Sequence, residues 1–425
     1  MVDAIEISRP FIEGRGEKFC RGCLGEELFS AIDLGDLPIA NELLQFQDSV
    51  SEKFPLHLRI CAQCGLGQVV DVVTPERIFR DYRYLSSMST TFLDHASGFV
   101  EHCLAEGLIS QGDWVLEIAS NDGYLLKSFI PFGITTVGVE PARNVAEISR
   151  GMGIDTISEF FSRDLARKIL TDRGFPKLII ANNVMAHVPD LIDFVQGLEI
   201  LTGPDTIVSI ENPSLENILN GMQFDSIYHE HYSYLSASSM RYICRSNGLQ
   251  LFKVDELSIH GGSNRYWLRR IDSELLTETS VDMVMNKEIE NGLFSQHAWM
   301  SYGAKIRAIM NDFRDWLELS NRNGNRVFGY GAAAKASTLL NAMSVESGLI
   351  RAIADISLEK QKRFLPSYGI EIISPQELFE SKPTDILIFP WNIKNEISDY
   401  LRANCDNEVR LWCAIPKMHQ VHCNE

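Results

Sequence analysis

The sequence of 425 residues predicts an α/β protein in which a small cysteine-rich module precedes two Rossmann-like units. Apolar runs at 114–119, 135–140, 177–184 and 206–212 alternate with helical segments, and this alternation is typical of a parallel sheet. A second strand–loop–helix pattern, RVFGYGAAAKASTLLN, begins at Arg326. Because a chain of this length can bury two or three cores, we expect three domains, at 1–75, 76–260 and 261–425.

Composition and charge narrow the class of protein. With 45% hydrophobic and 23% charged residues, the chain has the composition of a soluble globular protein. A formal charge of −18 argues against general binding to nucleic acid or a membrane surface, because phosphate groups would be repelled. No apolar stretch approaches a membrane span, and residues 1–14 lack the basic and apolar regions of a signal peptide. We therefore expect a cytoplasmic protein, as a monomer or a small homo-oligomer.

Four of the nine cysteines form two pairs, Cys20-Arg-Gly-Cys23 and Cys61-Ala-Gln-Cys64. Two such pairs supply the four thiolates of a tetrahedral Zn²⁺ site. Redox-active pairs are the weaker alternative, because neither pair lies at a strand–helix junction of the thioredoxin type. A closed site of four thiolates has no position for a reacting water, so we expect a structural metal. The other cysteines show no ligand spacing and are interpreted as packing residues: Cys103, Cys244, Cys405, Cys413 and Cys423.

The segment WVLEIASNDG at 114–123 reads as a buried strand that ends in a small polar loop before a helix. The next strand, TTVGVE, ends at Glu140, where a carboxylate can accept hydrogen bonds from both hydroxyls of a ribose. The loop lacks the G-x-G-x-x-G spacing of a pyrophosphate cradle, which favours an adenosine without phosphates, as in S-adenosylmethionine. A turn without a ligand is the alternative. The candidate cofactor-binding residues are Glu117, Ala119, Ser120, Asn121, Gly123, Glu140 and Asn182.

The segment FDSIYHEHYSYL at 224–235 is rich in titratable groups. In an extended conformation, Tyr228 and Glu230 would share one face while His229 and His231 share the other. In a turn, alternate members could converge on one pocket. We interpret the run as an acid/base cluster, with a His-x-His metal site and a surface loop without function as the alternatives.

Further polar residues occupy places where ligands bind in α/β folds. In FRDYRYLSSMST, at 79–90, Tyr82 and Tyr84 either pack on the sheet edge or contact a ligand. His187 follows the strand that ends at Asn182, and the glycines after His260 fit a tight turn or a close approach to a ligand. A long amphipathic helix is predicted at about 285–321. Beyond it, Lys335 adds a positive charge at a helix start that favours an anion.

Taken together, these pieces resemble the sugar C-methyltransferase family over nearly the whole chain. The resemblance implies an N-terminal zinc-binding module, a central Rossmann-like class I methyltransferase domain and a C-terminal Rossmann-like domain that helps to bind a nucleotide-sugar. Each motif alone is weak to moderate, but their order along one chain is specific. The motifs that carry it are the four cysteines, Glu117–Gly123, the Tyr-x-Tyr-x-Ser-Ser of 82–87, Ala186-His187, Tyr228–His231, His260–Ser263 and Gly331–Lys335.

The resemblance also implies a reaction, in which the carbon next to the ketone of a 4-keto deoxysugar is methylated at C-3. The sugar is carried on a nucleotide diphosphate, typically dTDP. His231 matches the family's base, with Tyr228 and Glu230 beside it to orient or tune it, and His187 matches a histidine that could stabilise an enolate oxygen. The candidate substrate-binding residues are Tyr82, Tyr84, His260 and Lys335.

Two positions depart from the family pattern. Ala119 stands where the cofactor loop of relatives usually carries glycine, and Ser367-Tyr368 stands where relatives tend to have Gly-Thr. The alternatives to a sugar C-methyltransferase are a methyltransferase with a non-sugar acceptor and a zinc-stabilised scaffold without catalysis.

Overall fold

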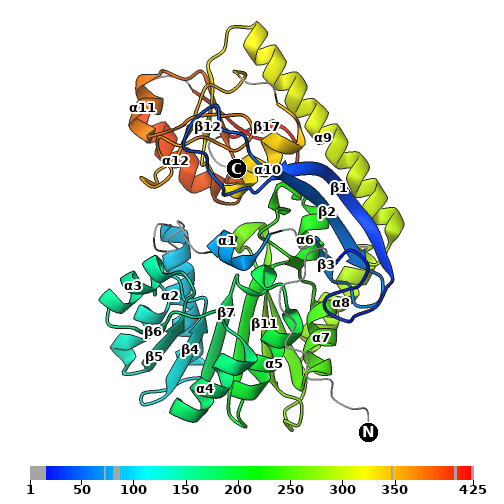
Figure 1. Ribbon diagram of the computed structural model, residues 1–425, viewed down its shortest axis with the longest axis vertical. Coiled ribbons are helices and arrows are strands. Elements are labelled where there is room, and N and C mark those ends of the chain that lie inside the picture. Colours follow the sequence, from blue (N-terminus) through cyan, green and yellow to red (C-terminus); the bar gives the residue numbers. More distant parts are fainter. Residues whose placement is uncertain are drawn as a thin grey trace.

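The computed structural model describes residues 16–70, 73–79, 87, 89–345, 348–405 and 409–422, and it has the predicted α/β architecture. Figure 1 shows the C-terminal sheet with its helices at the top and the central sheet below, while β1, β2 and α9 run along one side between them. The two Rossmann-like units therefore face each other across a gap that the N-terminal module flanks.

The central sheet has the strand order β10-β11-β8-β7-β4-β5-β6. Its parallel strands β4 (Trp114–Ile118), β5 (Thr135–Val139), β7 (Leu178–Asn182) and β8 (Ile207–Pro213) occupy the four predicted apolar runs, and β6 (Asp155–Ile157) lies at the edge. β11 (Ser263–Arg270) runs antiparallel to β8 and to β10 (Leu249–Leu257), so this sheet extends beyond residue 260. The helices of this part are α2 (Thr90–Ala105), α3 (Arg143–Gly151), α4 (Arg163–Arg173), α5 (Leu191–Leu201), α6 (Leu215–Asn220) and α7 (Ala237–Ser246).

The N-terminal sheet consists of β1 (Leu28–Pro38), β2 (Lys53–Cys61), β3 (Gly67–Gln68) and β9 (Ser233–Tyr234). β9 belongs to the central part of the chain, and it pairs with β3 through Gly67–Tyr234 and Gln68–Ser233. A short helix, α1 (Pro75–Phe79), follows. The module therefore binds directly to the segment that follows the Tyr228–His231 run.

The C-terminal sheet has the order β14-β13-β12-β15-β16-β17, in which β17 (His419–Gln420) is antiparallel to its neighbour. The parallel strands are β12 (Val327–Tyr330), β13 (Ile353–Ala354), β14 (Ile372–Ile373), β15 (Asp385–Ile388) and β16 (Arg410–Cys413). Its helices are α10 (Ala334–Ala342), α11 (Pro375–Glu380) and α12 (Lys394–Asn404).

The prediction of one helix at about 285–321 was wrong, because two helices occupy this region, α8 (Thr279–Glu290) and α9 (Gln296–Arg322). Gly292 has a φ of +82°, which ends α8, and the Ser295 side chain accepts a hydrogen bond from the Ala298 amide and caps α9. α9 packs on β1, and its buried Trp299 and Ile306 share a hydrophobic core with both the N-terminal sheet and the C-terminal sheet. This core holds the N-terminal module and the C-terminal unit together.

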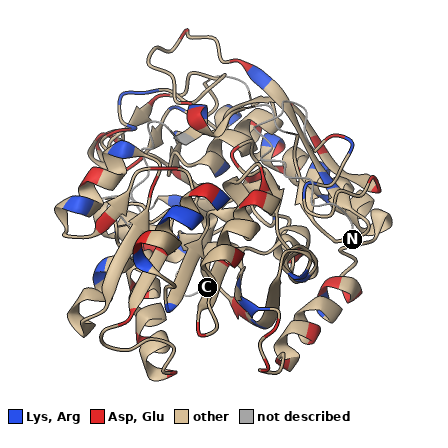
Figure 2. Ribbon diagram, turned by 60° about the horizontal axis from the view of Figure 1, so that its bottom comes forward, with Lys and Arg blue, Asp and Glu red and all other residues tan. Residues whose placement is uncertain are grey.

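Charged residues are distributed over all parts of the molecule, and Figure 2 shows acidic and basic positions interspersed along the helices. Among the described residues, every helix is too short or too polar to cross a membrane.

Candidate active site

The four cysteines Cys20, Cys23, Cys61 and Cys64 converge as predicted. Their sulfur atoms all lie within 4.8 Å of one another, and two of the Sγ–Sγ distances are 3.5 Å. Zn–S bonds of about 2.3 Å at tetrahedral angles require sulfurs about 3.8 Å apart, so the residues fit a Zn²⁺ ion. Gly65, with a φ of +77°, closes the second knuckle by donating its amide to the Cys61 carbonyl. The cluster shares a buried core with Met240 and Ile243 of α7, and its cysteines lie outside the described lining of the large cavity, as expected of a structural metal.

A cavity of about 1840 Å³ lies between the carboxyl ends of the central strands and the C-terminal sheet. Its lining includes Ala119, Asn121, Glu140 and Asn182 at one end, together with residues that begin α10. Ligands bind at this edge of open α/β sheets, because the loops that follow the strands leave a crevice there.

Glu140 lines the cofactor end of the cavity, and two further carboxylates lie behind the loop at this end. Glu117 at the end of β4 and Asp122 in the loop are both buried, and Glu117 Oε2 and both carboxylate oxygens of Asp122 lack a partner among the described residues. Burial, with the charges of Asp122 and Glu140, raises the pKa of Glu117 well above its usual value. No basic side chain pairs with these acids within the described chain. A ligand with a sulfonium, an ammonium group and ribose hydroxyls would supply the missing positive charge and donors, so the residues fit S-adenosylmethionine.

The individual cofactor candidates occupy different places in this end. Glu140 accepts hydrogen bonds from the backbone amides of Asn121 and Ala142, at 3.0 and 2.8 Å, and burial raises its pKa. Each carboxylate oxygen of Glu140 has a second lone pair, which remains available to accept a hydrogen bond from a ribose hydroxyl. Glu117, Ser120 and Gly123 lie outside the described cavity lining, so they shape the loop from behind. A Cβ on Gly123 would clash with Ile154.

The Tyr228–His231 run forms a turn, which decides between the two conformations that the sequence left open. The His231 amide donates to the Tyr228 carbonyl, and this brings the two side chains together, with Tyr228 Oη 2.8 Å from His231 Nε2. The rings lie 4.1 Å apart between centroids. The hydroxyl and the imidazole share one hydrogen bond, whose direction is set by the tautomer of His231. Burial and the charges of His187, Lys335 and His260 lower the pKa of His231 well below its usual value.

His229 and Glu230 point to the other side, toward the N-terminal module. His229 Nε2 lies 3.1 Å from the Phe54 carbonyl, so the imidazoles of His229 and His231 do not meet at one ion. The Glu230 carboxylate accepts hydrogen bonds from both the amide and the side chain of Asn41, each at 3.1 Å. Among the described residues, the hydrogen bond that orients the His231 imidazole is therefore the one with Tyr228.

His187 lies against His231, with ring centroids 4.6 Å apart. Its Nδ1 is 2.6 Å from the Glu230 carbonyl, and a carbonyl only accepts, so this nitrogen carries the hydrogen. Burial lowers the pKa of His187 to about 4. The neutral imidazole therefore presents a lone pair on Nε2, and it can donate to an enolate oxygen only after it gains a proton.

Two of the substrate-binding candidates line the same cavity. His260, in a left-handed conformation at φ 58°, lies 3.4 Å from the Asn183 side chain and 4.8 Å from the Phe92 ring, and burial lowers its pKa to about 4. Lys335 contacts the Ser226 hydroxyl, and its ammonium lies 4.6 Å from the Trp391 ring centroid. Burial lowers the pKa of Lys335, although Asp225 opposes this effect.

Tyr82 and Tyr84 lie outside the described residues, so the sequence-based expectation about them stays a prediction. Sequence reasoning missed Asn41, Ser226 and Trp391. These residues carry no motif, because their roles depend on contacts between segments far apart in the chain.

Comparisons with known proteins place the chain in a family. Residues 20–79 match the family of a zinc-binding domain, residues 95–254 that of a methyltransferase domain, and residues 258–416 that of the C-methyltransferase C-terminal domain. The chain is 30% identical to the C-methyltransferase NovU of Streptomyces niveus over 414 residues, which cover 97% of both chains.

Among solved structures, the chain is 15% identical to magnesium protoporphyrin IX methyltransferase from Synechocystis, covering 46% of this chain and 88% of that one with a TM-score of 0.33. It is 13% identical to an S-adenosylmethionine-dependent methyltransferase from Anabaena variabilis, covering 41% and 84% with a TM-score of 0.34. Structural similarities at such low TM-scores do not identify a function. The family matches and the full-length relative identify the family: the chain belongs to the sugar C-methyltransferase family and is a zinc-binding, S-adenosylmethionine-dependent C-methyltransferase.

Proposed function

We propose that this enzyme methylates C-3 of a 4-keto deoxysugar carried on a nucleotide diphosphate, with dTDP as the expected carrier. The proposal rests on the Tyr228–His231 pair. This pair lines the cavity whose other lining residues include those of the cofactor end, with Glu140 among them. Carbon becomes a nucleophile only when it loses a proton, and the proton next to a ketone is the acidic one. A neutral imidazole beside the cofactor end supplies the base for that step.

His231 is the proposed base. Its low pKa keeps the imidazole neutral at pH 7, and its Nε2 takes up the proton through the Tyr228 hydroxyl that already lies on it. Removal of the proton leaves an enolate, whose carbon is the nucleophile and whose oxygen carries the negative charge. S-adenosylmethionine supplies the electrophilic methyl group when it is bound. The Lys335 ammonium, which contacts the Ser226 hydroxyl and lines the cavity, stabilises negative charge on the substrate.

We assign the nucleotide end of the substrate to the C-terminal domain predicted at 261–425. The metal is assigned to the domain predicted at 1–75 and the cofactor to the domain predicted at 76–260. Gly331, with a φ of +87°, leads into α10, whose amino end borders the cavity and favours an anion. Asp355 follows β13 and accepts hydrogen bonds from the Ala332 amide and the Lys360 ammonium. The amino end of α10 and the Lys360 side chain, which both line the cavity, support this assignment.

Incubation with methyl-labelled S-adenosylmethionine and a series of 4-keto sugar nucleotides tests the proposal. We expect label on a sugar carbon, and exchange of the neighbouring hydrogen with heavy water that requires His231. His231→Ala should abolish the exchange, whereas His102→Ala should not, because His102 is a half-buried imidazole of α2 outside the described cavity lining. Label on oxygen alone, or exchange that persists in His231→Ala, would refute the proposal.

A further inference from the structure

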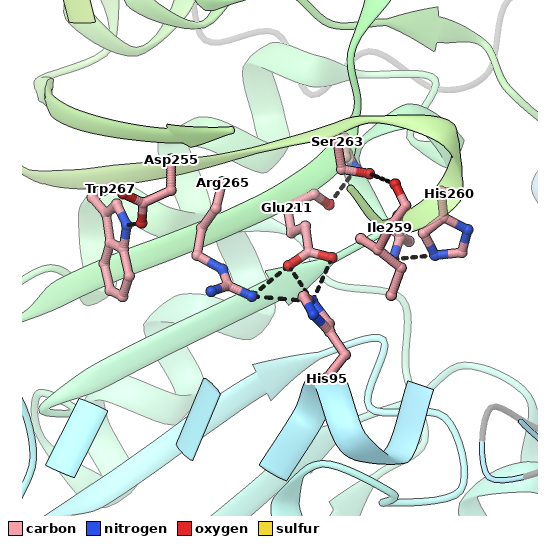
Figure 3. Close-up of polar contacts among 10 residues, drawn as sticks. His95, Glu211, Asp255, Ile259, His260, Ser263, Arg265 and Trp267 are labelled. Atoms are coloured by element: carbon pink, nitrogen blue, oxygen red, sulfur yellow. Dashed lines mark hydrogen bonds and ion pairs between the residues drawn. The ribbon is translucent and has the colours of Figure 1, made fainter. Parts of the chain in front are cut away.

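A second set of polar residues lines the cavity at the carboxyl end of β8, backed by an arginine of β11, and the reaction proposed above leaves it without a role. Figure 3 shows His95 of α2 pointing to Glu211 of β8, with Arg265 of β11 beside both. We call these residues and the adjacent Asn212 the β8 subsite. Sequence reasoning did not single out any of the four, because they come from three separate elements.

The carboxylate of Glu211 is held rigidly. It is 1% exposed, and Arg265 Nη2 lies 2.6 Å from its Oε2. Arg265 in turn lies over the Phe99 ring, 4.4 Å from the centroid. Burial alone would raise the pKa of Glu211, but the hydrogen bond from His95 and the charge of Arg265 hold it below its usual value. The carboxylate is therefore ionised and its charge is balanced by the guanidinium.

This carboxylate decides which nitrogen of His95 carries the hydrogen. His95 Nε2 lies 2.9 and 3.0 Å from the two oxygens of Glu211, which can only accept, so Nε2 must donate. When the imidazole is neutral, Nδ1 is then the nitrogen that carries the lone pair. Nδ1 makes no hydrogen bond to any residue within the described ranges, and the side chain, 25% exposed, lines the cavity.

Asn212 provides a second acceptor at the same place. Its side-chain amide donates to the Glu211 carbonyl at 2.7 Å, while its Oδ1 is buried without a partner among the described residues. Asn212 is 1% exposed and also lines the cavity. A buried carbonyl oxygen without a donor destabilises the protein, so a ligand that donates to it is favoured.

We propose that the β8 subsite recognises a hydroxyl group of the acceptor, which donates a hydrogen bond to His95 Nδ1 or Asn212 Oδ1. The inference rests on the proposed function and adds to it a specificity-determining contact. A hydroxyl fits better than an ammonium group, because Arg265 already neutralises the carboxylate of Glu211 and the subsite has no spare negative charge. Glu211 and Arg265 are positioning residues, which act through the imidazole of His95.

Calorimetric titration of the full-length protein with a 4-keto sugar nucleotide, in the presence of S-adenosylhomocysteine, tests the inference. His95→Ala should raise the Kd of the acceptor about tenfold to a hundredfold and leave the Kd of S-adenosylhomocysteine unchanged, which also shows that the variant is folded. Hydrogen exchange at saturating acceptor should persist, because His231 is intact. Glu211→Gln should weaken acceptor binding less than His95→Ala, and His102→Ala should have no effect.

Deoxy analogues of the acceptor identify the hydroxyl. One deoxy analogue should bind the wild type about tenfold more weakly than the parent acceptor binds it. The same analogue and the parent acceptor should bind equally well to His95→Ala or to Asn212→Ala. An unchanged Kd of the acceptor in both variants, with a wild type that methylates carbon, overturns this inference alone. Failure of the wild type to bind any 4-keto sugar nucleotide overturns the proposed function, and this inference with it.

Discussion

Replacement of Tyr228 by phenylalanine tests how the proton leaves the substrate. Tyr228 Oη lies 2.8 Å from His231 Nε2, so in the proposed mechanism the proton reaches this nitrogen through the hydroxyl. If the hydroxyl only oriented the ring, its loss would cost one hydrogen bond of about 1 kcal/mol, or roughly fivefold to tenfold in rate. Loss of a proton-transfer group costs about 10²–10⁴-fold. We expect the larger value for Tyr228→Phe.

The assay follows hydrogen exchange with heavy water and methyl transfer on the same samples. Both rates should fall together, because both require removal of the proton, and S-adenosylhomocysteine should bind as to the wild type. Tyr232→Phe is the matched control, since its buried hydroxyl donates to the Val73 carbonyl at 2.7 Å and does not reach His231. It should lower stability while the rate stays within about threefold. A loss of less than about tenfold in Tyr228→Phe would refute the relay through its hydroxyl.

Three further outcomes are expected. Ala119 has a φ of +57°, so Ala119→Gly should raise the free energy of unfolding by about 1 kcal/mol in urea denaturation, and a decrease would contradict the strain. Removal of zinc by a chelator should abolish hydrogen exchange, because β3 pairs with β9 and Asn41 binds Glu230; an active apo-protein, checked by metal analysis, would disprove this coupling. The neutral form of His231 is lost as the pH falls through its lowered pKa. The value of kcat/KM should therefore stay level down through pH 6.5 and fall only in more acidic buffer. A histidine inflection near pH 6.5 would contradict the lowering of the pKa by burial.

Local sequence patterns were sufficient to predict much of the structure of this protein. Alternation of apolar runs with helices predicted the parallel sheets, because strand and helix periodicities are properties of short segments. The two Cys-x-x-Cys pairs predicted the four-thiolate cluster, since the spacing within each pair already brings two sulfurs to one ion. The same local reasoning failed at residues 291–295, where a glycine and a serine cap divide one apparent helix into two.

The sequence by itself determined the fold class, the four clustered cysteines and the segment that carries the proposed base, because each depends on residues close together in the chain. Only the tertiary structure decided which nitrogen carries a hydrogen in His187 and in His95. Glu230 turns its carboxylate to Asn41 and its carbonyl to His187, and Glu211 sets the tautomer of His95 from a different element. Such contacts join residues up to 189 positions apart, so they follow from packing and not from any local pattern.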